Sequence, residues 1–289
     1  AEVIKVGAAW AQAGASGVGL ARSVEATMQA MIIGEMGAEA ATTGLIAIQS
    51  SYNLSSKDLL DVLADLNATE NQTAISMSGL IEVITRAGGT ARTAGISVQE
   101  LAAMAAALVP AAGSAAQAGN ALRTVISRIM SPTADAADLM RLMGIEVESA
   151  GWQSQTAMGR IQTLSQGFMG LSDAQKTVVS ASVASRWQIN RFDLLMEQVN
   201  SNMKNGTKGV GYYTAALNAM GDHQKAVAQY QRELNTYLGS SPQQFNILIA
   251  VLKNAMSTAI QPLIPSLIIL LKRVAGLAEA INKLSPETK

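Results

Sequence analysis

The stretch Gly95–Ile145, GISVQELAAMAAALVPAAGSAAQAGNALRTVISRIMSPTADAADLMRLMGI, decides the fold, because helix start and stop signals follow one another along it. Ser97 and Glu100 form the S-x-x-E pattern of a capping box. In that motif the two side chains accept hydrogen bonds from backbone N–H groups that have no partner within the helix. The pattern predicts a helix that begins at Val98.

A second helix is predicted from Ser114 and Gln117, which repeat the capping pattern. The apolar side chains that follow recur at helical spacing and share one face, while the intervening arginines and serine lie on the other face. These apolar residues are Leu122, Val125, Ile126 and Ile129. The pattern indicates a helix that is buried on one side only.

A third, short helix is predicted from Ser131 and Pro132, read as an N-cap followed by proline at the first helical position. Acidic residues at its start, Asp135 and Asp138, suit the positive end of a helix dipole. Gly144 suits the left-handed position after the last turn, which lets Ile145 pack back on Met140. The helix is therefore bounded at both ends.

Similar signals continue outside this stretch. Ser55 is an expected N-cap, and apolar residues at helical spacing follow it and recur in a further helix. The first set is Leu59, Val62, Leu63 and Leu66, and the second is Met77, Leu80, Ile81 and Ile84. Short helices with explicit caps indicate a compact helical array.

Composition supports the same fold class. Aromatic residues make up only 4% of the 289 residues, whereas 49% are hydrophobic, which favours close helix packing over a sheet. The 21 basic and 21 acidic residues balance, so the chain lacks the charge excess of a general or sequence-specific nucleic-acid binder. The absence of cysteine excludes disulfides and thiol chemistry. We predict an all-α protein without a cofactor.

The order GIS, an alanine-rich helix, A-G-N-A-L-R, S-P-T and L-M-G-I resembles the core region of phage tail tape measure proteins. The run Leu171–Asp173 and the Q-x-N-R-F segment Gln188–Phe192 resemble the same family, as does the helix end around Arg86 and Ala91. The resemblance covers roughly residues 40–199. Two features depart from the family pattern, namely the Gly88-Gly89 pair and Trp187.

The resemblance implies a structural, non-enzymatic role. Members of the family occupy the lumen of the tail tube near the tip, scaffold tube assembly, set tail length and leave ahead of the genome. The implied partners are copies of the same chain, in a trimer, and the tail tube and tail tip or baseplate hub proteins. The implied location is the virion, after assembly in the host cytoplasm. As a single helix with a rise of about 1.5 Å per residue, the chain would span only about 430 Å. Many tails are longer than that, so we expect the chain to be a fragment.

The sequence divides into four predicted segments. Residues 1–52 form an Ala/Gly/Met-rich lead with helical patterning, and 53–203 form the helical core. Residues 204–211 are glycine-rich and predict a linker. Residues 212–289 predict longer amphipathic helices, one ending near Gly239 and another beginning at Pro242.

A coiled-coil-like seam is predicted near the C-terminus, because apolar residues there alternate between steps of three and four. Pro262 and Pro265 interrupt the pattern before it, so a kink is expected there. Ile or Val alternating with Leu favours a coiled coil of two helices, whereas the resemblance implies three copies. Both stoichiometries remain open. The proposed self-association seam is Leu267, Leu270, Val274, Leu277, Ile281 and Leu284.

Each candidate chemical site has a simpler explanation. His223 is the only histidine, so histidine metal clusters are excluded and a surface helical residue is expected. The carboxylate pair Asp58 and Asp61 lies at a helix start, where the helix dipole accounts for it. The glycines of 206–211 lack the preceding strand and the G-x-x-x-x-G-K-[ST] order of a phosphate-binding loop. We therefore predict no catalytic, cofactor or metal residues.

One alternative function is a membrane-active helical protein that inserts residues 245–271 into the host membrane. Residues 254–271 carry no charge and approach the length of a span, but two prolines and polar Asn254 and Gln261 favour a buried helix. Transient membrane contact is compatible with either function. Flotation of a 240–289 peptide with liposomes separates stable insertion from soluble helical oligomers.

Overall fold

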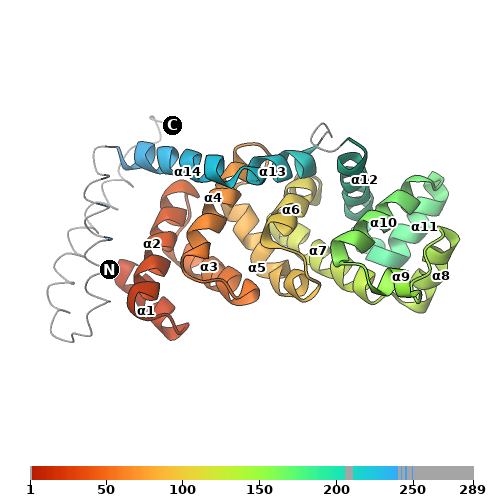
Figure 1. Cartoon of the computed structure of the whole chain (residues 1–289), viewed down its shortest axis with the longest axis horizontal. Coiled ribbons are helices and arrows are strands. Elements are labelled where there is room, and N and C mark those ends of the chain that lie inside the picture. Colours follow the sequence, from red (N-terminus) through yellow and green to blue (C-terminus); the bar gives the residue numbers. More distant parts are fainter. Residues whose placement is uncertain (1, 206–210, 240–241, 243–244, 246–248, 250–289) are drawn as a thin grey trace. The chain divides into compact units, whose positions relative to one another are not determined.

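The computed structural model describes residues 2–205, 211–239, 242, 245 and 249, and every regular element in these ranges is a helix (Figure 1). The predicted all-α class is confirmed for the part of the chain that is described. The six residues of the proposed seam lie outside the described residues.

The chain forms two compact units. The first contains residues 1–49, 54–63 and 231–289, and the second contains 50–53 and 64–230. The chain passes between the units around residues 50–53, within α4 (Asp58–Glu70) and within α14 (His223–Leu238).

The described part of the first unit begins with α1 (Glu2–Gln12) and α2 (Gly17–Ile33), which pack against each other. Trp10 is buried between them, and its indole N–H donates a 2.8 Å hydrogen bond to the Thr27 hydroxyl. Most of α3 (Ala38–Tyr52) belongs to the same unit. This N-terminal region is helical, as its methionine and aliphatic spacing predicts.

The second unit is built around α6, whose residues are buried on nearly every side from Val98 to Leu108. Helices α5, α6 and α7 contact one another, and α12 packs against α6, α7, α10, α11 and α13. The helices of this unit, in chain order, are α5 (Met77–Thr93), α6 (Val98–Ala112), α7 (Ala115–Met130), α8 (Ala134–Leu142), α9 (Ala150–Gln153), α10 (Ala157–Met169), α11 (Asp173–Ala184), the 3-10 turn η1 (Arg186–Gln188), α12 (Ile189–Asn205) and α13 (Tyr212–Gly221).

The predicted cap at the start of α6 and the predicted end of α8 are confirmed. Glu100 N–H donates to the Ser97 hydroxyl at 3.1 Å, and Ser97 N–H donates to the Glu100 carboxylate at 2.8 Å, so the capping box is complete. At the end of α8, Gly144 has φ +78 and Ile145 N–H donates to the Met140 carbonyl at 3.0 Å. This is the expected left-handed helix end.

The start of α8 differs from the prediction. Thr133, rather than Ser131, is the N-cap, and its hydroxyl accepts a 3.3 Å hydrogen bond from Ala136 N–H. Ser131 instead ends α7, because its own N–H donates to the Ser127 carbonyl. Pro132 lies between the two helices, where it separates them.

The capping pair before α7 is only half formed. Ser114 accepts from Gln117 N–H at 3.2 Å, as predicted. The Gln117 side-chain oxygen does not return to the N-cap but accepts a 2.6 Å hydrogen bond from Arg191. A residue predicted to act locally therefore joins two helices that are distant in the sequence.

The long helix predicted to end near Gly239 is two helices, because α13 ends at Gly221 and α14 begins at His223. Asp222 separates them, and its carboxylate accepts a 3.1 Å hydrogen bond from Lys225 N–H. The predicted end is confirmed, since α14 stops at Leu238 and Gly239 has φ +55. Helix α12 extends through Asn205, two residues into the predicted linker.

The Gly88-Gly89 pair lies inside α5 without interrupting it. A Cβ on Gly88 would lie 3.3 Å from the Tyr52 ring, so this glycine makes room for an aromatic side chain. A Cβ on Gly89 would meet nothing within 4 Å. The departure from the family pattern therefore has a packing reason at Gly88 only.

Helices α5 and α7 pack closely at Gly119, the glycine of the A-G-N-A-L-R segment. A Cβ there would lie 2.9 Å from the Arg86 Cβ and 3.2 Å from the Val83 Cα. Neither neighbour is the far end of a flexible side chain, so the approach requires glycine. The two helices therefore leave no room for a side chain at Gly119.

Candidate interaction surface

The residues predicted to carry a function lie mostly beyond what the structure describes. The seam from Leu267 to Leu284 is outside it, and of the 245–271 segment only Phe245 and Ile249 are described. Within the described helices, none is both long enough and apolar enough to cross a bilayer. The same residues contain no cluster of three or more His, Asp or Glu side chains suited to a metal ion.

His223 is exposed at the start of α14, as predicted for a surface helical residue. Its Nδ1 lies 3.0 Å from Oδ1 of the buried Asp65, whose other oxygen accepts a 2.9 Å hydrogen bond from Gln99. The contact ties α14 to the end of α4 and to α6. It is a polar tether between helices and brings no nucleophile to the histidine.

The predicted carboxylate pair also has a structural explanation. Asp58 accepts a 2.9 Å hydrogen bond from Ser55 N–H, and Ser55 accepts one from Asp58 N–H at 3.2 Å. Hydrogen bonds from Ser55 lower the pKa of the Asp58 carboxyl below its ordinary value. Asp58 is therefore an ionised helix cap, as expected at a helix start.

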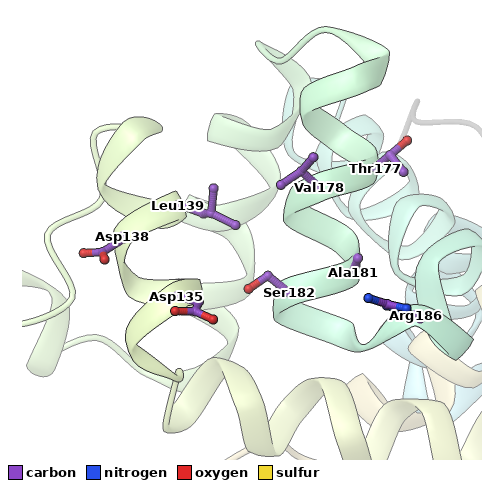
Figure 2. Close-up of a pocket in the computed structure, with 8 residues that line it drawn as sticks. All are labelled: Asp135, Asp138, Leu139, Thr177, Val178, Ala181, Ser182 and Arg186. Carbon is purple, nitrogen blue, oxygen red and sulfur yellow. The ribbon is translucent and has the colours of Figure 1, made fainter.

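The surface of the second unit is hollowed between α8 and α11 (Figure 2). We call this depression the α8–α11 groove, and it is open to solvent with a volume of about 630 Å³. In Figure 2, Leu139 and Val178 project from the two helices toward the space between them, and Ser182 lies between Asp135 and Arg186. The lining residues are Asp135, Asp138, Leu139, Thr177, Val178, Ala181, Ser182 and Arg186.

The groove carries opposite charges on its two sides. Asp138 is paired with Arg141 at 2.7 Å, and Arg141 also contacts Glu146 at 3.4 Å. Asp135 and Arg186 are exposed and have no ion-pair partner among the described residues. One free carboxylate on α8 therefore faces the same depression as one free guanidinium at the start of η1, just after α11.

Large apolar side chains are exposed on the two helices that form this groove and on η1. Val178 is 55% exposed and Leu142, three residues after Leu139 on α8, is 81% exposed. Trp187 follows Arg186 and is 87% exposed. Because the tryptophan points to solvent, its departure from the family pattern does not disturb internal packing.

The corner that displays Trp187 is held in place from both sides. Ser185 adopts φ +78 between α11 and η1, a conformation that costs free energy for a residue other than glycine. Arg191 donates to the Trp187 carbonyl at 3.1 Å and to the Ala112 carbonyl at 3.2 Å, which joins the corner to the end of α6. Phe192, the next residue, stacks edge-on against Phe168 with ring centroids 5.4 Å apart.

The inner face of α11 is packed, in contrast to its outer face. Val179 and Val183 are buried, and the Ser180 hydroxyl donates a hydrogen bond to the Asp193 carboxylate of α12. Burial raises the pKa of the Asp193 carboxyl above its ordinary value, although the Ser180 hydrogen bond and the charge of Lys176 act in the opposite direction. The groove therefore rests on a fixed helix.

Arginines join this region to the rest of the unit through backbone carbonyls. Arg160 is 5% exposed and donates to the carbonyls of Trp152 at 3.2 Å, Gln153 at 3.1 Å and Met130 at 3.4 Å. Its guanidinium also lies 5.4 Å from the Trp152 ring centroid. Arg128 of α7 donates to the Ser182 carbonyl of α11 at 3.2 Å. The last carbonyls of a helix have no N–H partner within that helix, and these arginines donate hydrogen bonds to such carbonyls.

The arrangement supports binding rather than catalysis. The groove combines exposed apolar side chains with unpaired charges, which is the character of a protein contact surface. Sequence reasoning missed it, although Asp135, Leu139 and Leu142 have the spacing of one helical face. The sequence does not show that α8 and α11 lie side by side.

The family described as phage-related minor tail proteins matches residues 1–185 of this chain. A protein of Escherichia phage P2 named "Probable tape measure protein" is 32% identical over 106 residues. That match covers 37% of this chain and 13% of the P2 protein, so the aligned part is a small fraction of the relative's length. No solved structure matches the chain significantly.

Proposed function

This chain belongs to the phage-related minor tail protein family, and from that premise we propose that it is a segment of a tape measure protein that scaffolds assembly of the tail tube. The observation that carries the proposal is the 32% identity to the phage P2 protein named as a probable tape measure. The helical fold with glycine-dependent close packing at the A-G-N-A-L-R segment supports it, because those residues are the ones that carry the family resemblance.

The two compact units suggest which functions belong to this segment and which belong to other parts of a longer protein. An extended helix spans about 1.5 Å per residue, whereas a folded array spans far less. We therefore assign residues 2–205 and 211–239 to attachment, near the tail tip. Tail length is then set by extended parts of the parent protein outside this chain.

The proposed partners are sister copies of the chain, the inner wall of the tail tube, and the tail tip or hub proteins. Charged residues make up 15% of the sequence and are balanced, so contacts to the wall are chiefly apolar and individually weak. Release ahead of the genome then requires no breaking of strong ionic contacts. Release that depends steeply on ionic strength would contradict this mechanism.

The test of attachment uses the parent phage with single substitutions in this segment. Gly119→Ala forces α5 and α7 apart and is expected to reduce the number of assembled tails seen by electron microscopy, while the tails that do form keep their normal length. Gly89→Ala, on the same helix pair but in open space, is the matched control and should assemble normally. Normal tail numbers from a variant shown to be unfolded in isolation would refute the scaffold role.

The test of length control lies outside these units. Duplicating an extended helical part of the parent protein should lengthen the tail by about 1.5 Å per added residue. An unchanged tail length would refute the length-setting part of the proposal and leave the attachment role to stand on the first experiment.

A further inference from the structure

The α8–α11 groove has a property that is independent of the C-terminal seam, since its two unpaired charges are of opposite sign and lie on opposite sides of one depression. A surface of this kind is self-complementary. In a contact with two-fold symmetry, residue i of one copy meets residue j of the other, and j meets i. Asp135 of each copy would then face Arg186 of its mate.

We propose that the α8–α11 groove is a docking surface for the same groove of a second copy of this chain, in a two-fold contact. The charge pattern selects this occupant, because a second copy supplies a guanidinium for Asp135 and a carboxylate for Arg186 in one step. An arbitrary helix would need to carry both charges at matching positions.

Exposed apolar side chains of α8, α11 and η1 supply the contact area in this proposal. Leu142, Val178 and Trp187 are the most exposed large apolar residues among those described in the second unit. Exposed tryptophan is among the side chains that contribute most when buried in an interface. The strained Ser185 and the hydrogen bonds of Arg191 hold the tryptophan at the corner without a covering element of its own unit.

The full chain contains no cysteine, which allows a direct test. Val178→Cys places a single thiol on the groove, and treatment with a short bismaleimide should link two copies. Ser50→Cys, an exposed residue of α3, is the matched control and should give little dimer under the same conditions. Linkage at Val178→Cys no stronger than at Ser50→Cys would overturn the proposal.

Charge reversal then separates this contact from any association through the seam. In the Val178→Cys background, Asp135→Lys or Arg186→Glu alone places like charges opposite each other in both symmetric pairs and should lower the dimer yield at least about tenfold at low salt. The double variant Asp135→Lys/Arg186→Glu restores opposite charges and should recover the yield to within about threefold. Arg123→Glu, on an exposed part of α7, should change nothing.

Failure of the double variant to recover, with its helical circular dichroism intact, would overturn the two-fold arrangement. A thiol at position 178 that is shielded from maleimide and forms no dimer would show that the chain itself covers the groove, which also overturns the proposal. The experiment rests on the isolated chain and not on tail assembly. A negative result here would therefore leave the proposed scaffold function untouched.

Discussion

Two helix pairs of the second unit meet in opposite ways. Helices α5 and α7 close on each other at Gly119, where not even a methyl group fits. Helices α8 and α11 leave an open groove, lined by unpaired charges and exposed apolar side chains. A glycine lets the backbones of α5 and α7 approach, whereas Leu139 and Val178 line the open space between α8 and α11.

The comparison separates residues that build the unit from residues that remain available to a partner. Helix α7 carries its apolar residues, from Leu122 to Ile129, inside the unit. Helix α8 buries only Ala136 and Met140 and leaves Leu142 in solvent. The following predictions test whether the closed pair carries stability and the open pair carries association.

The largest effect is expected from Arg160→Ala. The substitution removes the hydrogen bonds that the guanidinium of Arg160, which is 5% exposed, donates to the carbonyls of Met130, Trp152 and Gln153. The free energy of unfolding, measured by urea titration, should fall by about 3 kcal/mol. Arg123→Ala, on the solvent side of α7, is the control, and a similar loss in both would show that Arg160 has no special role.

A smaller loss is expected from Gly119→Ala. The added methyl group must displace backbone or Cβ atoms of α5 and should cost about 2 kcal/mol, more than the roughly 1 kcal/mol that alanine gains over glycine in a helix. Gly89→Ala meets no neighbour and should instead raise the free energy of unfolding by about 0.5–1 kcal/mol. In urea titration, the free energy of unfolding should fall for Gly119→Ala and rise for Gly89→Ala. A change of the same sign in both variants would contradict close packing at Gly119.

The hydrogen bond between Ser180 and Asp193, beneath the groove, should make the free energy of unfolding depend on pH. Because the folded-state pKa of Asp193 is raised, this group favours folding below its unfolded pKa, and that contribution is lost as the pH rises through the folded pKa. Asp193→Asn keeps an acceptor for Ser180 and should be more stable than the wild type at pH 7, by less than about 1 kcal/mol given its partial exposure.

The advantage of Asp193→Asn should disappear on acidification below the ordinary aspartate pKa of about 4. Thermal melts at a series of pH values measure it. A constant difference in stability at all pH values would show that the pKa of Asp193 is the same in the folded and unfolded states.

The smallest effect on stability is expected at the open pair itself. Val178→Ala should change the free energy of unfolding by no more than about 0.5 kcal/mol, because the side chain is largely in solvent. Its neighbour Val179, which is buried, is the matched comparison, and Val179→Ala should cost about 2 kcal/mol. Comparable losses at both positions would mean that the groove belongs to the packed interior.

Local signals allowed much of the fold to be predicted from sequence. The capping box at Ser97 and the glycine end at Gly144 appear where expected, because each depends on residues within one turn. The start of α8 was misplaced since Ser131 and Thr133 are both able to cap a helix, and the choice depends on where α7 ends. The break at Asp222 was missed because the apolar pattern continues on either side of it.

The surface could not be predicted in the same way. Asp135 and Arg186 are far apart in the sequence, and both line one groove because α8 packs against α11 in the folded unit. Similarly, the sequence assigned Gln117 to a cap, whereas the folded unit uses it to bind Arg191. Pairing between distant helices is decided by packing, which the order of residues alone does not reveal.

The arginines that reach backbone carbonyls have one more consequence. A guanidinium keeps its proton throughout the physiological range, and an amide oxygen has no proton to gain in mild acid, so neither side of such a bond titrates. Junctions built with carboxylates would weaken as those groups become neutral. The joints at Met130, Trp152 and Ser182 therefore contain no carboxylate that acid could neutralise.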